Sequence, residues 1–313
     1  MAARRRRGSA VWAGAGLTVL ALITIALTFL ALTQRGEIAE AGSTPGATPL
    51  PTAPAAPLAA PAEVPAIQPM VVIAPTRALD AIDASSAARA AFTTCPEPTT
   101  LEVTGDAGST WEATEASGLA SLQRISADAS GFLAAIGLGV DGCAPAYERS
   151  FTSGDAWETM PEALAASWFV DPANRAGLHA PAGNIAAPCP AVLQVAVVDE
   201  STAAVLCEDG TVHVTGDSGV AWVATSPISG IAALAATSDG YQAVVVNQNG
   251  CSGAQVLAVA IVEGAAHVGA AGGCLDAAIP AGGVAVDSAV DGSTWVWAGD
   301  RNGLSPDGGL SWL

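Results

Sequence analysis

Thr215-Gly216-Asp217-Ser218-Gly219-Val220-Ala221-Trp222 is one of four short stretches in which a small turn leads into a tryptophan. Residues 104–111 (TGDAGSTW) and 305–312 (SPDGGLSW) have the same Ser/Thr-x-Asp-x-Gly-x-x-Trp spacing. The fourth stretch, 150–157 (SFTSGDAW), keeps Gly154 and Trp157 but has Thr152 in place of the aspartate. A turn that recurs at fixed offsets is typical of a repeated supersecondary unit, and this repeat decides the expected architecture.

Each residue of the pattern has a structural explanation. The aspartate accepts hydrogen bonds from backbone N–H groups further along the turn, and the glycine adopts a positive φ without a Cβ penalty. The hydroxyl adds a second bond from side chain to backbone, and the tryptophan packs over the turn. The residues at these positions are Thr104, Asp106, Gly108, Trp111, Gly154, Trp157, Thr215, Asp217, Gly219, Trp222, Ser305, Asp307, Gly309 and Trp312.

The spacing resembles the Asp-box, or BNR, repeat of sialidase-like β-propellers, of photosystem II assembly factors and of sortilin-type ectodomains. This resemblance covers about residues 70–313. It implies that the turns join the third and fourth strands of propeller blades, away from the ligand face. Because the boxes are structural in all these families, the resemblance implies no particular activity.

Strand-like segments rich in Val, Ala and Ile alternate with Gly/Asp/Ser turns from residue 70 onward. Repeating units begin near residues 79, 122, 193, 231 and 284, with a period of about 45 residues and four strands each. We therefore predict an all-β protein, a β-propeller of about five four-stranded blades. A sixth blade is the alternative, if the insertion within residues 161–190 hides a decayed unit. We also predict that the apolar segment 70–74 completes the last blade, whose final turn ends at the C-terminus.

Residues 1–69 differ in composition from the repeat region. Residues 1–10 contain four consecutive arginines, and residues 11–33 form an uncharged apolar run long enough to span a bilayer. We predict a cytoplasmic basic tail (1–10), a transmembrane signal anchor (11–33), a disordered Pro/Ala-rich linker (34–69) and an extracellular propeller domain (70–313). A cleaved signal peptide is the alternative, although no convincing Ala-x-Ala site follows the run.

The net negative charge of the chain restricts its possible binding partners. The chain contains no lysine, and beyond residue 33 seven arginines face 29 acidic residues, a formal balance of −22. Nucleic acid is therefore not expected as a partner, because phosphate binding needs a basic surface. The alanine-rich, lysine-free usage resembles that of high-GC actinobacterial proteins.

All six cysteines lie beyond the apolar run, and an even number in an exported domain predicts disulfides. Fifteen pairings are possible in principle. Cys95, Cys143, Cys207 and Cys251 occupy similar places after the second strand of successive units. We expect Cys189–Cys207 and Cys251–Cys274 within blades, and Cys95–Cys143 as the remaining pair. No metal site is expected, because no Cys-x-x-Cys spacing or histidine cluster is present.

No catalytic residues are predicted. Arg124-Ile125-Ser126 is the closest approach to the Arg-Ile-Pro motif that the sialidase resemblance implies, and no Gly-x-Ser-x-Gly elbow or phosphate loop is present. The best candidate for a binding surface is Trp168, Phe169 and Arg175, in the insertion. The alternative for the aromatic pair is simple packing in the outer strand of the second blade.

We therefore expect a membrane-tethered, non-catalytic extracytoplasmic propeller without a cofactor, which binds a protein or an envelope glycan. A degenerate glycoside hydrolase of the sialidase-like superfamily and a purely structural envelope protein are the alternatives. The sequence names neither the ligand nor the face that binds it.

Overall fold

The computed structural model describes residues 72–115 and 117–313. The predicted basic tail (1–10), signal anchor (11–33) and linker (34–69) lie outside the described residues. Among the residues described, no helix has the length and apolar character needed to cross a membrane. The predicted propeller domain (70–313) is described except for residues 70, 71 and 116.

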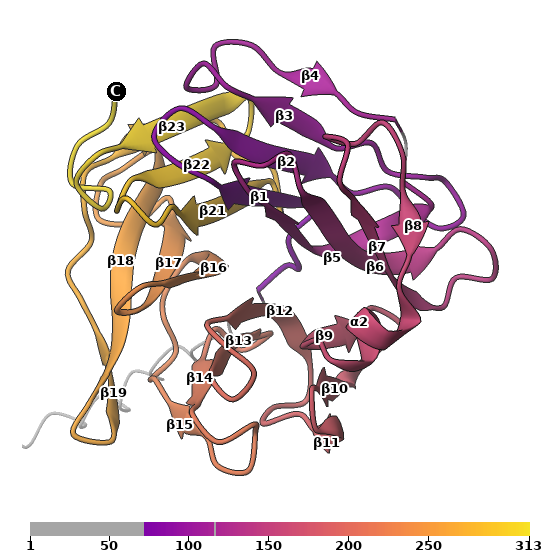
Figure 1. Ribbon diagram of the computed structural model, residues 1–313. Coiled ribbons are helices and arrows are strands. Elements are labelled where there is room, and N and C mark those ends of the chain that lie inside the picture. The colour runs from indigo at the N-terminus through magenta and orange to yellow at the C-terminus, as the bar shows by residue number, and fades with distance from the viewer. Residues whose placement is uncertain (1–71, 116) are drawn as a thin grey trace, which may run out of the picture. The chain divides into compact units, whose positions relative to one another are not determined.

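Antiparallel sheets stand around a common axis in this domain (Figure 1). Residues 72–115 and 117–313 form six of them, so the domain is a six-bladed β-propeller and the predicted number of five blades is wrong. The first strand of each blade lies nearest the axis, and the later strands follow outward (Figure 1). The five predicted unit starts all fall in such innermost strands.

The first three blades cover residues 77–186. Blade one contains β1 (Arg77–Ala81), β2 (Ala87–Ala91), β3 (Glu102–Thr104) and β4 (Glu112–Ala113). Blade two contains β5 (Leu119–Ala127), β6 (Leu133–Gly139), β7 (Pro145–Ser150) and β8 (Glu158–Thr159). A short helix, α2 (Pro161–Ala165), precedes blade three, which contains β9 (Phe169–Asp171), β10 (Asn174–Ala180) and β11 (Gly183–Ala186).

The last three blades cover residues 192–305. Blade four contains β12 (Val192–Val197), β13 (Ala203–Cys207), β14 (Val212–Thr215) and β15 (Val223–Ala224). Blade five contains β16 (Ile231–Thr237), β17 (Gly240–Val246), β18 (Gly253–Val262) and β19 (Ala265–Val268), with β20 (Leu275–Asp276) also paired to β18. Blade six contains β21 (Val284–Ser288), β22 (Thr294–Ala298) and β23 (Arg301–Ser305).

Blade three is the unit that the repeat period did not show. It occupies the insertion within residues 161–190 and has three strands instead of four in the described chain. This blade also lacks the Ser/Thr-x-Asp-x-Gly-x-x-Trp turn, so the spacing of the turns gave no sign of it. The alternative of a decayed sixth unit is therefore correct.

Small apolar side chains fill the space between neighbouring blades. The second strands of blades two, four and five are buried on both faces, and all five residues of β13 are inaccessible to solvent. Alanines dominate these contacts, as at Ala87, Ala88 and Ala243, which have no exposed surface. Small side chains allow the sheets to approach closely, which explains why a chain with few aromatic residues still forms a dense core.

The ring does not close in the predicted way. Residues 72–74, the described part of the segment expected to complete the last blade, belong to no sheet. The Val72 amide instead donates to the carbonyl of Glu208 at 2.8 Å, and the Val72 side chain packs in the core between blades four and five. Burial of this side chain holds the segment away from β23, so the prediction of an added strand is wrong.

Side chains of blades one and six close the ring instead. Arg77 donates from Nη1 to the carbonyl of Gly299 at 2.6 Å, and Arg89 donates from Nη1 to Oδ1 of Asn302 at 3.0 Å. Trp295 is buried between the two blades and donates from Nε1 to the carbonyl of Asp83 at 2.9 Å.

Three disulfides join the six cysteines in the pairs that the sequence analysis favoured. They are Cys95–Cys143, Cys189–Cys207 and Cys251–Cys274, with sequence separations of 48, 18 and 23 residues. Cys95–Cys143 joins loops of blades one and two, and the other two pairs close shorter segments around blades four and five. Disulfides of this number are typical of proteins that fold in an oxidising compartment.

Candidate functional site

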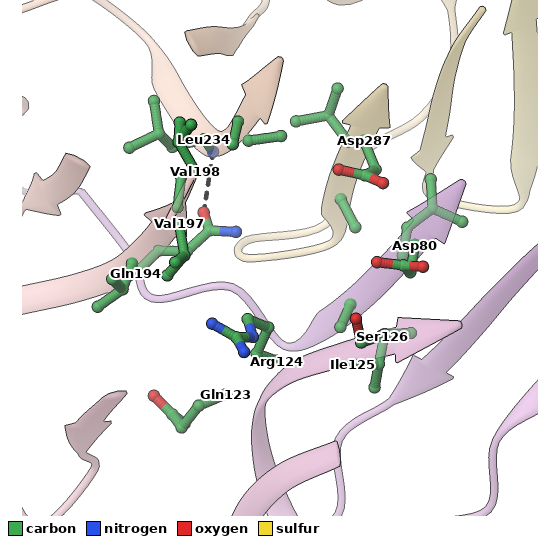
Figure 2. Close-up of a pocket in the computed structure, with 18 residues that line it drawn as sticks. Asp80, Gln123, Arg124, Ile125, Ser126, Gln194, Val197, Val198, Leu234 and Asp287 are labelled. Atoms are coloured by element: carbon green, nitrogen blue, oxygen red, sulfur yellow. Dashed lines mark hydrogen bonds between the residues drawn. The ribbon is translucent and has the colours of Figure 1, made fainter. Parts of the chain in front are cut away.

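A cavity lies on the propeller axis, where the innermost strands converge (Figure 2). Its volume is about 300 Å³, and β1, β5, β12, β16 and β21 contribute its lining. Strand alternation explains the lining in β1, where Leu79 and Ala81 are buried in the core between blades while Asp80 faces the cavity. Aliphatic side chains form much of the wall. The charged and amide side chains in it are Asp80, Gln123, Arg124, Gln194 and Asp287.

Three of these polar side chains connect one blade to the next. Oδ2 of Asp287 accepts a hydrogen bond from the Ala81 amide at 2.8 Å, which joins blade six to blade one. Oδ2 of Asp80 accepts from the Ala127 amide at 2.8 Å, which joins blade one to blade two. The other oxygen of Asp80 has no hydrogen-bond partner among the described residues, whereas the backbone of Ser288 also interacts with the Asp287 carboxyl.

Gln194 makes the same kind of connection from blade four to blade five. Its Oε1 accepts a hydrogen bond from the Leu234 amide at 2.9 Å (Figure 2). Gln123 is held at the base of the cavity, because its Nε2 donates to the carbonyls of Ser121 and Leu122 at 3.2 and 3.0 Å. The opposite ends of the two amides, Nε2 of Gln194 and Oε1 of Gln123, have no partner among the described residues.

Asp80 and Asp287 lie on neighbouring innermost strands and influence each other. Burial raises the pKa of Asp80 to about 7, although the hydrogen bond from Ala127 and the charge of Arg124 act in the opposite direction. Burial, and after it the negative charge of Asp80, raises the pKa of Asp287 well above its usual value. At neutral pH the two carboxyls therefore carry fewer than two negative charges.

Arg124 is the one cation in the cavity wall. The ion pairs of the described chain are Arg89–Glu102 and Arg149–Glu158, so Arg124 belongs to neither. No hydrogen bond joins it to the other side chains of the cavity (Figure 2). Burial lowers the pKa of Arg124, but a guanidinium titrates so high that it stays charged at neutral pH.

The tryptophan turns form as the sequence predicts. In the turn at residues 215–222, Thr215 donates to Oδ1 of Asp217 at 2.8 Å and accepts from the Gly219 amide at 3.0 Å. Oδ1 of Asp217 also accepts from the Ala221 amide at 2.9 Å, and Gly219 has a φ of 84°. The turns of Asp106 and Asp307 repeat these three bonds. The hydroxyl donates to the carboxylate, the glycine amide donates to the hydroxyl, and a later backbone amide donates to the carboxylate.

The turn at residues 150–157 works without an aspartate. The Thr152 hydroxyl accepts from the Ala156 amide at 3.0 Å, and the Ser150 hydroxyl accepts from the Gly154 amide at 3.0 Å. All four turns follow the third strand of a blade, remote from the axial cavity. Thr104, Gly108, Trp111, Trp157, Trp222, Ser305, Gly309 and Trp312 thus belong to the outer part of the propeller.

Trp168, which was predicted to belong to a binding surface, is buried. This side chain is 2% exposed, packs edge-on against Trp222, and donates from Nε1 to the carbonyl of Glu200 at 3.2 Å. Trp168 fills the core between blades three and four, because it stands directly before β9, the innermost strand of blade three. The alternative of packing is correct for Trp168, but the strand is the innermost strand of the third blade and not the outer strand of the second.

Phe169 and Arg175 also make internal contacts. Phe169 stacks on His179, with ring centroids 4.5 Å apart. Arg175 donates from Nη1 to the carbonyls of Val192 and Leu193 at 3.1 and 3.2 Å, which ties blade three to blade four. The described residues contain one group with metal-ligand proximity, Cys251, Cys274 and Asp276, but its two sulfurs form a disulfide.

Sequence reasoning missed most of the axial cavity. Asp80, Asp287, Gln123 and Gln194 were not singled out, and Arg124 was noted only as part of a defective motif. One signal was present: Asp80 and Asp287 occupy equivalent positions in two short apolar strands, ALDA and AVDS. A charged side chain inside such a strand is costly unless it faces a polar space.

No family model matches the sequence, and no curated protein matches it. Among solved structures, YCF48 bound to a D1 peptide has 17% identity and a TM-score of 0.29, covering 80% of this chain and 74% of that one. An Aleuria aurantia lectin mutant in complex with Fucα1-6GlcNAc has 12% identity and a TM-score of 0.48, covering 78% and 96%. A GH74 xyloglucanase from Xanthomonas campestris has 19% identity and a TM-score of 0.32, covering 75% and 37%. Similarities of this size assign no ligand or activity.

Proposed function

We propose that this chain is a membrane-tethered, non-catalytic, extracytoplasmic β-propeller that binds a protein or an envelope glycan through its axial cavity. The observation that carries the proposal is Arg124, a half-buried guanidinium that faces the cavity and belongs to neither ion pair of the described chain. A charge that is partly removed from water without a partner is costly, and a ligand that supplies the partner would offset this cost.

Three further features support an extracytoplasmic location. The three disulfides are typical of an oxidising compartment. The apolar run 11–33, preceded by arginines, is typical of a signal anchor. The acidic balance of the chain keeps such an exported domain soluble and disfavours anionic polymers as partners.

The test is a capture experiment with the full-length chain in mild detergent. The chain is immobilised, exposed to envelope extract and to a glycan array, and compared with Arg124→Gln. Arg301→Gln serves as the matched control, because Arg301 is exposed and lies outside the cavity. We expect a ligand that the control retains and Arg124→Gln loses; capture that is equal for both variants would place binding outside the cavity.

A second function has one observation in its favour. Asp80 and Asp287 place two carboxyl groups with raised pKa values in one cavity, and glycoside hydrolases use such pairs for acid and base chemistry. Incubation with each glycan that the array identifies, followed by analysis of released sugar, tests this alternative. Turnover that Asp287→Asn abolishes would replace the binding-only proposal.

A further inference from the structure

The unpaired groups of the axial cavity have opposite charges on different strands. Arg124 extends from β5, while the carboxyl groups of Asp80 and Asp287 belong to β1 and β21 (Figure 2). No ion pair joins Arg124 to either carboxyl. Arg124 and Asp80 are nevertheless close enough for each to shift the pKa of the other. The cavity thus separates a cation from carboxyl groups across an open space.

We infer that the axial cavity binds a small zwitterion, an α-amino acid unit whose carboxylate pairs with Arg124 and whose ammonium group pairs with Asp80. The inference rests on the proposed function, because it takes the same cavity as the binding site. Nε2 of Gln194 would add a donor to the ligand carboxylate.

Charge compensation favours a zwitterion over a ligand that carries a single charge. A carboxylate alone would satisfy Arg124 but would bring a second negative charge close to Asp80. An ammonium ion alone would satisfy Asp80 and leave Arg124 unpaired beside a new cation. A zwitterion pairs both groups without a change of net charge, so the cost of burying each protein charge is offset.

Cavity size restricts the ligand further. A volume of about 300 Å³ is at the lower limit of ordinary ligand sites. A single amino acid fits this space better than an extended chain. The unit can be a free amino acid or the end of a short peptide, and the two sources are distinguished by comparing glycine with glycylglycine.

Binding of an ammonium group requires the ionised form of Asp80. The charged or titratable side chains that face Asp80 are Arg124 on β5 and Asp287 on β21. Because the pKa of Asp80 is about 7, its ionised fraction rises between pH 6 and pH 7.5. The affinity for the zwitterion should rise about five- to tenfold over this interval.

Isothermal titration calorimetry on the full-length chain in mild detergent tests the inference. The probes are glycine, glycylglycine, acetate, methylammonium and D-glucose. We expect glycine to bind at least tenfold more tightly than acetate, methylammonium or glucose, and glycylglycine to show whether a peptide is also accepted. Arg124→Gln and Asp80→Asn should each weaken glycine binding at least tenfold, and Arg301→Gln should leave it unchanged.

Folding of the variants is checked by thermal unfolding. Asparagine keeps an oxygen that accepts the hydrogen bond from Ala127. If Arg124→Gln does not fold, Arg124→Met replaces it, because methionine also removes the cation. Asp80→Asn should also abolish the rise of affinity with pH. Equal binding of acetate and glycine, preference for glucose, or glycine binding unaffected by these variants would each overturn the inference. If glycine fails while envelope capture still depends on Arg124, the zwitterion inference fails and the proposed function stands.

Discussion

At the scale of single residues, the tryptophan turns use buried hydroxyl groups to organise exposed carboxylates. The Thr215 side chain is 2% exposed, and its oxygen both donates to Asp217 and accepts from the Gly219 amide. The hydroxyl therefore satisfies a backbone N–H that water reaches poorly. The same arrangement at Thr104 and Ser305 shows that the hydroxyl is as much a part of the motif as the aspartate.

Thr215→Val tests this role. Valine has the shape of threonine but leaves the Gly219 amide without its acceptor, so we expect the free energy of unfolding to fall by about 1–3 kcal/mol. Chemical denaturation monitored by tryptophan fluorescence measures the change. Thr100→Val is the control, because Thr100 is exposed and has no hydrogen bond among the described residues; equal effects of the two variants would show that the hydroxyl bond contributes nothing.

A second residue-scale prediction concerns Asp80 and pH. The folded pKa of about 7 lies above the ordinary value for aspartate, so the unfolded chain releases this proton at lower pH than the folded chain. Asp80 therefore lowers stability progressively between about pH 4 and pH 7, by roughly 2–4 kcal/mol. Asp80→Asn, which cannot ionise, should be more stable than the parent chain at pH 7.5 and about equal to it at pH 4.

Denaturation at the two pH values measures this difference. Asp141→Asn, a substitution of an exposed aspartate, controls for the general effect of removing a negative charge. If Asp80→Asn destabilises the chain more at pH 7.5 than at pH 4, the carboxylate is stabilised in the folded state and the assigned direction of the pKa shift is wrong; equal effects at the two pH values would mean that the pKa is not shifted.

Residue-level prediction from sequence succeeded where the interactions are local. The hydroxyl, aspartate and glycine of each turn lie within five positions of one another, so their spacing alone predicts their bonds. Asp80 and Asp287 are brought together only when the first and last blades meet. No short spacing in the sequence indicates that these two residues lie close together, so a search for sequence motifs could not predict the axial site.

At the scale of elements, blade three shows the limit of repeat analysis. Its innermost strand β9 has three residues, and a bulge between β9 and β10 interrupts the register. The four-strand period and the tryptophan turn are both absent from this blade, so only spatial arrangement identifies it. The other five blades were detected because each innermost strand is longer than β9, with 5 residues in β1 and β21, 6 in β12, 7 in β16 and 9 in β5.

The Cys189–Cys207 disulfide connects the segment that follows blade three to β13 of blade four. Cys189→Ala combined with Cys207→Ala releases a loop of 18 residues, and we expect a loss of about 3 kcal/mol of unfolding free energy. Denaturation of the variant and of the parent chain, both without reductant, measures the loss. A loss under about 1 kcal/mol, or free thiols in the unfolded parent chain without reductant, would contradict the prediction.

At the scale of the whole molecule, a cluster of arginine and tryptophan side chains joins the first and last blades. No strand from the N-terminal segment is shared between them in the described chain. Arg89 lies 3.9 Å from the ring centroid of Trp111 and 4.6 Å from that of Trp297. Arg77 covers Trp297 from a distance of 4.1 Å. The cluster spans blades one and six, so its contacts hold together parts of the chain that are far apart in sequence.

Arg89→Met tests whether this cluster closes the ring. Methionine keeps an apolar side chain but removes the cation, the bond to Asn302 and the ion pair with Glu102, in which the Arg89 side chain is 14% exposed. We expect a loss of about 2–4 kcal/mol of unfolding free energy. Hydrogen exchange should also accelerate in β1 and β23 before it does in blades three to five, because the ring would open at the junction of its first and last blades.

Arg149→Met is the matched control for this last prediction. Arg149 also pairs with a glutamate and lies 4.9 Å from an aromatic ring centroid, but its partners Glu158 and Phe151 belong to the same blade. Its side chain is 31% exposed, so its loss should cost only about 0–1 kcal/mol. Similar losses for the two variants, or exchange that accelerates evenly in all six blades, would show that closure depends on the apolar core between blades one and six and not on the arginine cluster.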